Sequence, residues 1–316
     1  MLCSRLDWFV ESNRRLSDAQ SGFRRSKSTS DNVVALWSAV NLAFCKKEHL
    51  VAVFIDIKSA FDNVNIGLLS ARLKLIGAPN NFCDLIFNLF YFKNLFVESD
   101  SGFVNVTSFT GVPQGCVLSP ICFNIYINEI FKGLPRNVHV LGYADDVVVF
   151  CSDKIVENAI ISLQIALDSI NSKLTSLQLF LSPNKSKAMI FSKKIIFDHN
   201  LPRCLKICNN DINYVNSSNF QGFIFQSNLK LNIHVEGIVK KCSGFINVLR
   251  SLCGVSWGSD TRCLLLLFLG VIRPKIEYMA PLLLNCPVEY RTSSCQTFYS
   301  RTYTLPKYSV IFKTFI

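Results

Sequence analysis

Three aspartates have the residue type and surroundings that phosphoryl-transfer chemistry needs. Asp56 lies near the end of the apolar run 51–57 (VAVFIDI), and Asp145 and Asp146 lie in the tetrapeptide YADD between two strand-like stretches. Transfer onto a primer 3′-hydroxyl needs charge neutralised on the attacking and leaving oxygens, which two metal ions about 3.5 to 4 Å apart accomplish. Magnesium takes hard oxygen ligands such as carboxylates. If strand ends converge on one sheet edge, these side chains could hold two Mg²⁺ ions.

Each aspartate also has an ordinary structural interpretation. Asp56 could cap a following helix, and the pair Asp145 and Asp146 could simply make a polar turn. Taken one at a time, these interpretations are favoured. The catalytic hypothesis therefore depends on the wider pattern.

Strands must deliver these carboxylates, and the hydrophobic pattern predicts them. The run 51–57 is β-branched and nearly all apolar, which is typical of a buried central strand. Residues 138–142 and 147–151 flank YADD and predict a β-hairpin with both carboxylates at its tip. Further strands are predicted over 94–99 and 103–109, as a hairpin, and over 187–191 and 220–225.

Helices are predicted around these strands by apolar residues recurring at three and four positions. The first stops at Gly77, and a proline in the first turn opens another. The predicted helices are 68–76, 80–92, 119–131 and 155–179.

From about residue 230 the pattern is wholly helical and includes Lys240, Lys241 and Arg250, so we expect a subdomain boundary there. The apolar run 263–272 (CLLLLFLGVI) is shorter than the roughly 20 residues of a bilayer span, which favours a buried helix. The basic, aromatic segment 291–316 has no clean period and receives no assignment.

Composition agrees with a folded protein that meets a polyanion. The chain has 316 residues, half of them hydrophobic, and 33 Lys and Arg against 22 Asp and Glu give a net charge of +11. That charge suits nucleic acid or an acidic membrane surface. With no secretory signal visible, the 13 cysteines are expected to be reduced thiols. Cys204 and Cys208 have no second Cys or His pair nearby at zinc-site spacing, so buried small hydrophobes are expected.

Six sequence blocks follow one another along the chain: AQSGFRRSKST (19–29), FIDIKSAFDNV (54–64), GVPQGCVLSP (111–120), YADD (143–146), LSPNKSKAMIF (181–191) and FQGFIF (220–225). In this order they resemble the polymerase domain of non-LTR retrotransposon reverse transcriptases of the LINE and jockey type. YADD alone would be weak support, whereas six ordered blocks over about two thirds of the chain are specific. RPKIEY (273–278) is similar to a further signature beyond the palm.

The resemblance implies roles for the acidic residues. Asp56 and Asp145 would bridge two Mg²⁺ ions, and the backbone carbonyl of Ile57 would complete one metal shell. Asp146 would support the primer terminus and the local field. Lys187 would protonate the leaving pyrophosphate as a general acid, with Lys185 as a competitor for that role.

The resemblance also implies contacts to the incoming nucleotide. Phe61 would be the steric gate that fills the space of a ribose 2′-hydroxyl, the alternative being an ordinary core Phe. Backbone amides of Ser59, Ala60 and Phe61 would cradle the triphosphate. Gln114, in a tight loop, would touch the nascent base pair, with the adjacent glycine letting backbone approach closely.

The basic residues of the first block have the same implied target. Arg24, and less surely Arg25 and Lys27, would grip the triphosphate, for which guanidinium forks are suited. A solvated basic loop is the alternative.

The expected fold is α+β, a right-hand polymerase with an antiparallel palm sheet plus helices, truncated fingers and a helical thumb-like region. The expected domains are partial fingers (1–50), a palm with embedded fingers elements (51–230), a thumb-like region (231–290) and the unassigned tail (291–316). The fingers are expected to be truncated because only about 20 residues precede the first block. We expect no endonuclease domain and no Cys/His knuckle.

The resemblance implies RNA-directed DNA synthesis from dNTPs, with an RNA template, a DNA primer and Mg²⁺. One alternative is a catalytically inactive nucleic-acid-binding remnant of such an element. A second is a maturase-like RNA chaperone, which would carry a basic splicing domain that the sequence after residue 290 does not suggest. We expect no membrane partner and an intracellular protein, in the cytoplasm or nucleus; oligomeric state is not predicted.

Overall fold

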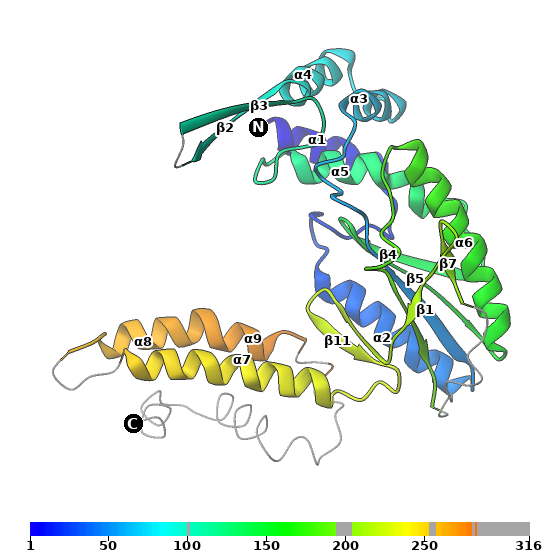
Figure 1. Ribbon diagram of the computed structural model, residues 1–316, viewed down its shortest axis with the longest axis vertical. Coiled ribbons are helices and arrows are strands. Elements are labelled where there is room, and N and C mark those ends of the chain that lie inside the picture. The colour runs from blue at the N-terminus through cyan, green and yellow to red at the C-terminus, as the bar shows by residue number, and fades with distance from the viewer. Residues whose placement is uncertain (100–101, 194–203, 253–256, 280–281, 283–316) are drawn as a thin grey trace. The chain divides into compact units, whose positions relative to one another are not determined.

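The computed structural model describes residues 1–99, 102–193, 204–252, 257–279 and Leu282 (Figure 1). The chain divides into two compact units, Met1–Gln221 and Gly222–Ile316. The division falls inside the predicted palm, upstream of the boundary expected near residue 230. The unassigned tail, 291–316, lies outside the described residues.

The first unit is organised by a five-stranded sheet with the order β4-β5-β1-β6-β9. Neighbouring strands are antiparallel except β6 and β9, which are parallel. The expectation of an α+β fold with an antiparallel sheet is therefore confirmed. The strands are β1 (His49–Ile55), β4 (Val138–Tyr143), β5 (Asp146–Asp153), β6 (Lys187–Phe191) and β9 (Asn213–Tyr214).

β1 is the central strand, as its sequence predicts. Residues Leu50 to Ile55 are all buried, because the strand has neighbours on both edges and helices on both faces. Val53 pairs with Val149 of β5 and with Ala188 of β6, so β-branched and small side chains fill the middle of the sheet. β1 is thus a rigid support for whatever follows Ile55.

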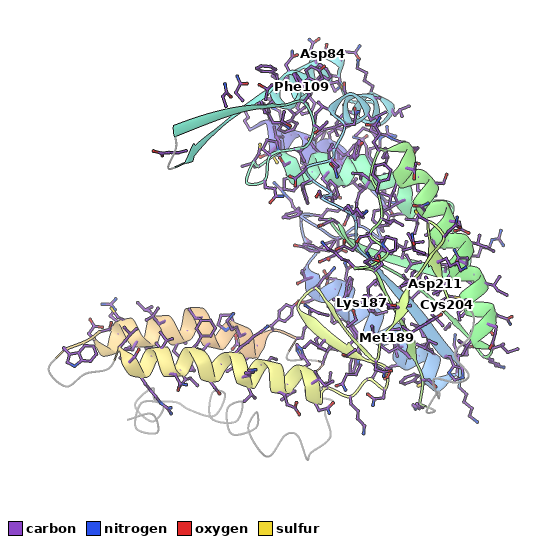
Figure 2. All side chains as sticks on the ribbon, in the orientation of Figure 1. Asp84, Phe109, Lys187, Met189, Cys204 and Asp211 are labelled. Carbon is purple, nitrogen blue, oxygen red and sulfur yellow. The ribbon has the colours of Figure 1, made fainter. Side chains whose placement is uncertain are left out.

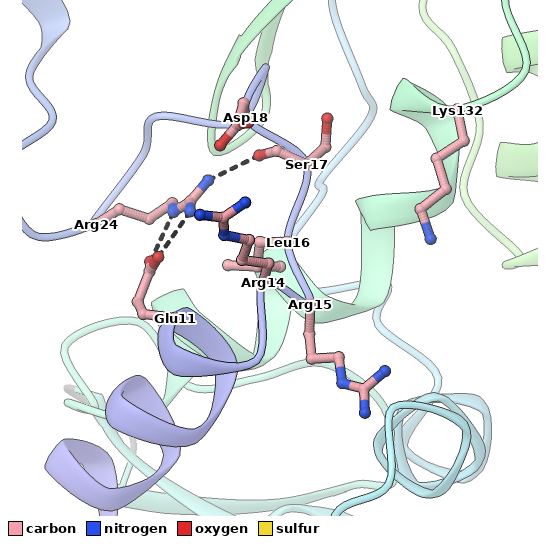
Figure 3. Close-up of a pocket in the computed structure, with 8 residues that line it drawn as sticks. All are labelled: Glu11, Arg14, Arg15, Leu16, Ser17, Asp18, Arg24 and Lys132. Carbon is pink, nitrogen blue, oxygen red and sulfur yellow. Dashed lines mark hydrogen bonds and ion pairs between the residues drawn. The ribbon is translucent and has the colours of Figure 1, made fainter.

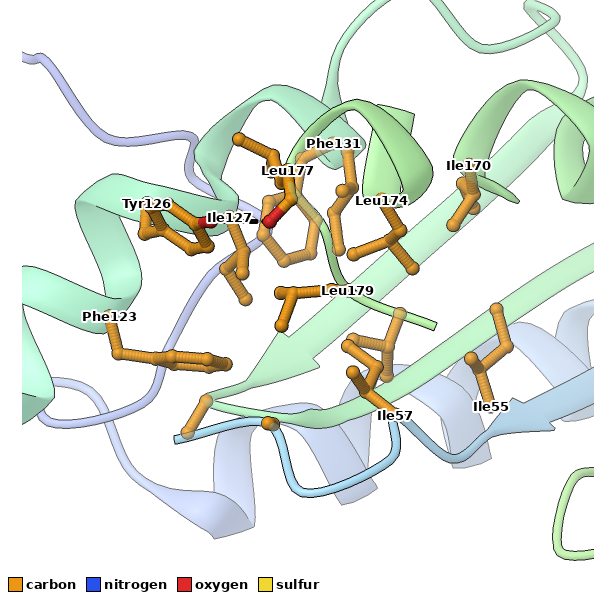
Figure 4. Packing of buried hydrophobic residues seen from close by; sticks show 14 of the residues in the cluster. Ile55, Ile57, Phe123, Tyr126, Ile127, Phe131, Ile170, Leu174, Leu177 and Leu179 are labelled. Carbon is orange, nitrogen blue, oxygen red and sulfur yellow. Dashed lines mark hydrogen bonds between the residues drawn. The ribbon is translucent and has the colours of Figure 1, made fainter. Parts of the chain in front are cut away.

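Helix α6 (Val156–Ser176) covers one face of the sheet, and α5 (Ser119–Ile127) with the short 3₁₀ helix η1 (Asn128–Phe131) extends this layer (Figure 4). Residues 119–131 are almost entirely buried, so the predicted helix is confirmed with a tightened last turn. Tyr126 places its hydroxyl inside this core and donates it to the carbonyl of Leu177.

Helix α2 (Thr29–Cys45) packs on β1 and β4 from the other face (Figure 1). Its start is fixed by a capping box in which the backbone N–H of Ser28 donates to the carboxylate of Asp31 at 2.6 Å. The helix buries Val33, Leu36 and Val40, spaced at three and four, against the sheet.

Three further helices and a hairpin complete the elements that precede α5. The hairpin and the helix break at Gly77, where φ is +87°, agree with the sequence predictions. These elements are α1 (Leu2–Ser12), α3 (Ile66–Leu75), α4 (Asn80–Tyr91), β2 (Lys93–Ser99) and β3 (Gly102–Ser108). A small second hairpin is formed by β7 (Lys206–Ile207) and β8 (Asn210–Asp211).

The single strand predicted over 220–225 is wrong. β10 (Ser217–Phe220) ends at Phe220 and β11 (Phe223–Gln226) begins at Phe223. Gln221 and Gly222 between them have φ values of +52° and +83°, which turn the chain instead of extending it. The apolar run FQGFIF conceals this turn because only the glycine signals it.

In the second unit the described secondary-structure elements after β11 are helices, as predicted. They form α7 (Asn232–Ser251), α8 (Thr261–Leu267), a π-helical turn, Phe268–Ile272, and α9 (Arg273–Glu277). The buried helix predicted over 263–272 is only partly correct, since Leu264, Phe268 and Ile272 are buried whereas Cys263, Leu266 and Leu267 are exposed. Among the described residues, no helix combines the length and apolar character that a bilayer crossing requires.

The cysteines within the described residues are free thiols. Cys83, Cys122, Cys151 and Cys242 are buried and act as small apolar side chains. The expectation of burial is wrong for Cys204 and Cys208, which are exposed at the β7–β8 hairpin.

Candidate active site

The three aspartates meet at one end of the sheet. Ile55 and Val147 form the last pair of β1 with β5, so Asp56 and Asp146 come directly after and before paired residues. Tyr143 pairs with Asp146 and closes the β4–β5 hairpin, which leaves Asp145 in the turn. The convergence of strand ends that the sequence required is therefore present.

Asp56 is fixed through its backbone by the segment that follows α6. Its N–H donates to the buried hydroxyl of Ser186 at 3.1 Å, and its carbonyl accepts from the N–H of Ser182 at 2.8 Å. The Ser186 hydroxyl donates in turn to the carbonyl of Ser182. Ile57 then forms an isolated bridge with Leu181. The LSPNKS segment thus holds the chain where it leaves the sheet.

The hairpin turn that carries Asp145 has an unusual backbone. Ala144 has φ +56°, a left-handed conformation that residues with a Cβ rarely adopt. Gln20, fully buried, contacts both polar atoms of this residue: its side-chain Oε1 accepts from Ala144 N–H at 3.0 Å and its Nε2 donates to the Ala144 carbonyl at 3.2 Å. Gln20 was missed in the sequence analysis, although it belongs to the first block, because its residue type alone indicates no chemistry.

The electrostatics of the site reflect burial of the carboxylates first and crowding of like charges second. Desolvation by the surrounding protein raises the pKa of Asp145, and the charge of Asp56 raises it further. Desolvation also raises the pKa of Asp146, whose side chain reaches solvent, and the charges of Asp145 and Asp56 add to it. A cation bound between ionised carboxylates would relieve their mutual repulsion and stabilise their charged form.

The donor set fits magnesium better than a metal held by protein alone. Within the described part of the chain, no group of three or more His, Cys, Asp and Glu side chains is arranged to hold a metal ion. Mg²⁺ is commonly bound by one or two carboxylates together with substrate phosphates and water. Asp56 and Asp145, whose charges interact, could supply two such carboxylates.

Phe61 lies against the core without being fully enclosed by it. Its ring stacks on the buried ring of Phe123, with centroids 4.3 Å apart and an interplanar angle of 21°. The carbonyl of Phe61 accepts from the N–H of Val112 at 2.9 Å, which ties this segment to the GVPQG loop. One face of the ring is thus held by α5, and the residue is half-buried.

The turn before Phe61 and the GVPQG loop meet closely. Ser59 has φ +42°. A Cβ on Gly111 would lie 2.6 Å from the carbonyl oxygen of Asp62, so only glycine allows this approach. The close approach predicted for the glycine after Gln114 is not seen within the protein, since a Cβ on Gly115 would meet nothing within 4 Å. Gln114 itself is exposed.

Arg24 has partners other than a nucleotide in this structure (Figure 3). Its Nε and Nη2 donate to the carboxylate of Glu11, both at 2.7 Å, and its Nη1 donates to the carbonyls of Ser17 and Gln20. Its side chain is only 8% exposed. The guanidinium therefore serves the fold here, and its predicted grip on a triphosphate stays a prediction.

Arg24 lines a cavity of about 640 Å³ that is rich in cations. Arg14, Arg15 and Lys132 line the same cavity (Figure 3). Lys27, three residues after Arg24, donates to the carbonyl of Asp18 at 2.7 Å. Burial together with the charge of Arg24 lowers the pKa of Lys27. The basic side chains of Arg24 and Lys27 thus both bind protein groups.

Lys187 is the first residue of β6 (Figure 2), which pairs with β1 near the end that leads to Asp56. It pairs with Phe54, two residues before Asp56, which corresponds to a separation of about 7 Å along a strand. Lys187 and its competitor Lys185 are both exposed. This pairing register favours Lys187 over Lys185 as the predicted general acid, because the position of Lys187 is fixed in the sheet whereas Lys185 lies in the preceding turn.

Comparison with known proteins identifies relatives over most of the chain. Residues 1–225 match the family described as reverse transcriptase (RNA-dependent DNA polymerase). The chain is 26% identical over 260 residues to a probable RNA-directed DNA polymerase from transposon BS of Drosophila melanogaster, covering 80% of this chain and 28% of that protein. It is 27% identical over 177 residues to the RNA-directed DNA polymerase from mobile element jockey of the same species, covering 54% and 19%.

A third relative is the retrovirus-related Pol polyprotein from type-1 retrotransposable element R1 of Bradysia coprophila, 24% identical over 274 residues, with 84% of this chain and 26% of that protein covered. The chain thus spans only 28% and 26% of the first and third of these relatives.

Solved structures support the fold. Telomerase from Candida albicans, in complex with a TWJ fragment of telomeric RNA, matches 99% of this chain and 49% of its own with a TM-score of 0.50 and 14% identity. Apo telomerase from Candida tropicalis matches 72% and 39% with a TM-score of 0.51 and 13% identity. These likenesses agree with the expected right-hand polymerase fold. Because the family match covers well over half of its residues, the chain belongs to the reverse transcriptase family and groups with polymerases of non-LTR retrotransposons.

Proposed function

We propose that this chain carries the active site of an RNA-directed DNA polymerase, which adds deoxynucleotides to a primer 3′ end on an RNA template. The observation that best supports this function is the convergence of Asp56, Asp145 and Asp146 at one end of the sheet. Burial raises the pKa values of Asp145 and Asp146, and the like charges of the neighbouring carboxylates raise them further, as in a site prepared for cations.

Asp56, Asp145 and the carbonyl of Ile57 would hold magnesium. Two Mg²⁺ ions, when bound, would neutralise charge on the attacking 3′-oxygen and the leaving pyrophosphate. Asp146, more exposed than its neighbour, would face the primer terminus. The hydrogen bonds from Ser182 and to Ser186 would keep Asp56 in place while substrates exchange.

The incoming nucleotide would lie between the segment after β1 and the GVPQG loop. Backbone N–H groups of Ser59 and Ala60 would bind its phosphates, a role that the positive φ of Ser59 supports because such turns orient successive amides together. Phe61 would exclude a 2′-hydroxyl, and exposed Gln114 would reach the new base pair. Lys187 would donate a proton to the leaving pyrophosphate.

The partners in this proposal are an RNA template, a DNA primer and dNTPs, and the reaction would take place in the cytoplasm or nucleus. A catalytically inactive nucleic-acid-binding remnant is the second candidate. It is favoured by one observation, namely that Glu11, Ser17 and Gln20 occupy the guanidinium of Arg24.

Primer extension distinguishes the two candidates. The purified chain should extend a DNA primer on poly-rA with dTTP and Mg²⁺. Asp145→Asn should abolish synthesis, because it removes a ligand charge, while RNA affinity measured by filter binding stays within a few-fold. Asp84→Asn, which removes the same charge from the exposed face of α4, is the matched control and should extend normally.

RNA binding without synthesis by the unaltered chain would favour the remnant. Equal activity of Asp145→Asn and the unaltered chain would contradict the metal-ligand assignment.

A further inference from the structure

We propose that Gln20 is a positioning residue for the catalytic carboxylates, because its side-chain amide holds the Ala144 peptide in the left-handed conformation from which Asp145 and Asp146 extend. This inference rests on the proposed function of those carboxylates. Gln20 would touch neither metal nor substrate, and would act only through the hairpin turn.

The side-chain amide of Gln20 bonds both the N–H and the C=O of Ala144. A backbone residue in a regular hairpin satisfies its N–H and C=O with the partner strand, but Ala144 lies in the turn and uses Oε1 and Nε2 of one side chain instead. Gln20 is 0% exposed, so water cannot replace either bond. Oε1 also accepts from the N–H of Gly22 at 3.1 Å, which orients the amide.

The conformation that Gln20 stabilises is unfavourable by itself. With φ +56°, the backbone of Ala144 has a left-handed conformation that mainly glycine adopts. A residue with a Cβ keeps such a conformation only where surrounding contacts stabilise it. Ala144 is also buried, at 3% exposure. Without the bidentate contact, the turn would have access to commoner conformations, which would redirect the two carboxylates that follow.

Neighbouring contacts connect the same segment to the same hairpin. Ser21 N–H donates to the carbonyl of Gly142 and Gly142 N–H donates to the carbonyl of Ala19, both at 2.8 Å, so residues 19–21 add a short parallel bridge beside β4. Asn32 of α2 donates to the same Gly142 carbonyl at 3.0 Å.

Gly22 extends this contact to the turn itself. A Cβ on Gly22 would lie 2.3 Å from the Ala144 nitrogen, so the segment fits directly against the turn. The first sequence block is thereby built as a support for the YADD turn.

A matched control exists for the loss of a buried amide. Asn128 is also buried, and its side chain likewise bonds two backbone groups, accepting from Ser17 N–H and donating to the Arg15 carbonyl, both at 2.8 Å. It supports the same N-terminal segment without contacting the hairpin. Asn128→Leu should therefore lower stability as Gln20→Met does, while leaving the turn unchanged.

Hydrogen exchange of the Ala144 amide reports on the turn without requiring activity. In the unaltered chain this amide should be protected, because Gln20 is its acceptor. Gln20→Met, which keeps the length and removes both polar atoms, should speed its exchange at least tenfold. Asn128→Leu should not. An unprotected Ala144 amide in the unaltered chain would overturn the inference, and this measurement requires no variant to fold.

Primer extension supplies the second readout. Gln20→Met should lower kcat and raise the Mg²⁺ concentration for half-maximal extension several-fold, whereas Asn128→Leu should change neither. Adding Ala144→Gly to Gln20→Met should restore part of the activity, because glycine adopts φ +56° without strain.

Unchanged exchange and Mg²⁺ dependence in Gln20→Met would refute the role of Gln20. If the unaltered chain does not extend primers, the proposed function fails, and the exchange comparison still decides whether Gln20 holds the turn.

Discussion

Asp145 and Asp146 link the candidate chemistry to the stability of the fold. Burial and neighbouring carboxylates raise both pKa values above the ordinary value of 3.8. The folded state therefore binds protons more tightly than the unfolded chain, and the free energy of unfolding falls as pH rises from the ordinary pKa through the raised one. At neutral pH, without metal, these carboxylates destabilise the protein.

We accordingly predict that Asp145→Asn raises the melting temperature at pH 7 in the presence of a chelator. Each kcal/mol of relieved repulsion corresponds to roughly 2–4 °C for a chain of this size class. The difference should vanish near pH 3, where Asp145 is protonated in both states, and Mg²⁺ should stabilise the unaltered chain more than the variant. Calorimetry measures all three effects, with Asp84→Asn as control; a lower melting temperature for Asp145→Asn at pH 7 would contradict the prediction.

Phe61 provides a test of substrate selectivity. An rNTP would push its 2′-hydroxyl into the ring, an overpacking clash of about 1–3 kcal/mol, or roughly tenfold to a hundredfold in selectivity. Stacking on Phe123 prevents the ring from moving aside easily. Phe61→Val should raise rNTP incorporation relative to dNTP and leave Mg²⁺ dependence unchanged.

The ratio of incorporation rates in single-nucleotide extension measures the effect. Phe109→Val, which truncates an exposed aromatic side chain outside the proposed site, is the control. An unchanged ratio in an active Phe61→Val enzyme would mean that Phe61 is an ordinary core residue.

Residue types predicted the acidic centre but not its support. Asp56, Asp145 and Asp146 could be found because they lie within an ordered set of sequence blocks, although each of them taken singly has an ordinary structural interpretation. Gln20 could not, because a buried glutamine gains its role only from a turn more than a hundred residues away in sequence. Arg24 shows that residue type does not identify a partner, since its guanidinium binds the carboxylate of Glu11 in this fold while its contact to a triphosphate stays a prediction.

At the scale of elements, hydrophobic period was a sound guide wherever burial follows one face. The strands β1, β4 and β5 and the long helix α6 agree with their predicted ranges to within a few residues. Prediction failed where neighbours decide the outcome. The run 220–225 reads as one strand although Gln221 and Gly222 turn the chain, and the apolar run 263–272 is exposed on one side.

A buried histidine leads us to expect that the second unit is sensitive to acid. His234 of α7 accepts from Ile224 N–H through Nδ1 and packs against the ring of Phe223, 4.3 Å between centroids. Burial, and to a smaller extent the charge of Lys241, lowers the pKa of His234 to about 4. Its folded-state pKa lies below the unfolded value of 6.5, so the stability it supports is present above pH 6.5 and is lost as pH falls toward 4.

We expect α7 to lose protection from hydrogen exchange as pH falls from 6.5 to 4, after correction for intrinsic exchange rates. His234→Leu, which removes the titrating ring, should make protection of α7 almost independent of pH in this window. His139→Leu, on the sheet of the first unit, is the control and should leave the pH response of α7 intact. A pH response of α7 that persists in His234→Leu would exclude this histidine as its origin.

At the scale of the whole molecule, charge should govern affinity for nucleic acid. The net charge of +11 favours phosphate contacts that release condensed counterions, with a log–log salt slope near −0.7 per contact on single strands. Binding of the chain to RNA should therefore weaken steeply between 50 and 200 mM salt, roughly within the range where such contacts are screened. Filter binding across this range measures the slope, and a flat response would contradict a basic nucleic-acid surface.

The order of strands also determines when the candidate active site can form. β1 is made early in synthesis, but one edge waits for β5 and the other for β6, whose Lys187 is the partner of Phe54. Because these contacts are distant along the chain, the entropy of closing long loops is lost before the contacts stabilise the fold, which slows folding. A nascent chain released before Ser186 would lack β6, so Asp56 would follow a half-paired strand and its N–H would have no Ser186 hydroxyl as acceptor. Whether a copy of this protein forms the aspartate site therefore depends on its chain length at release from the ribosome as well as on the aspartates themselves.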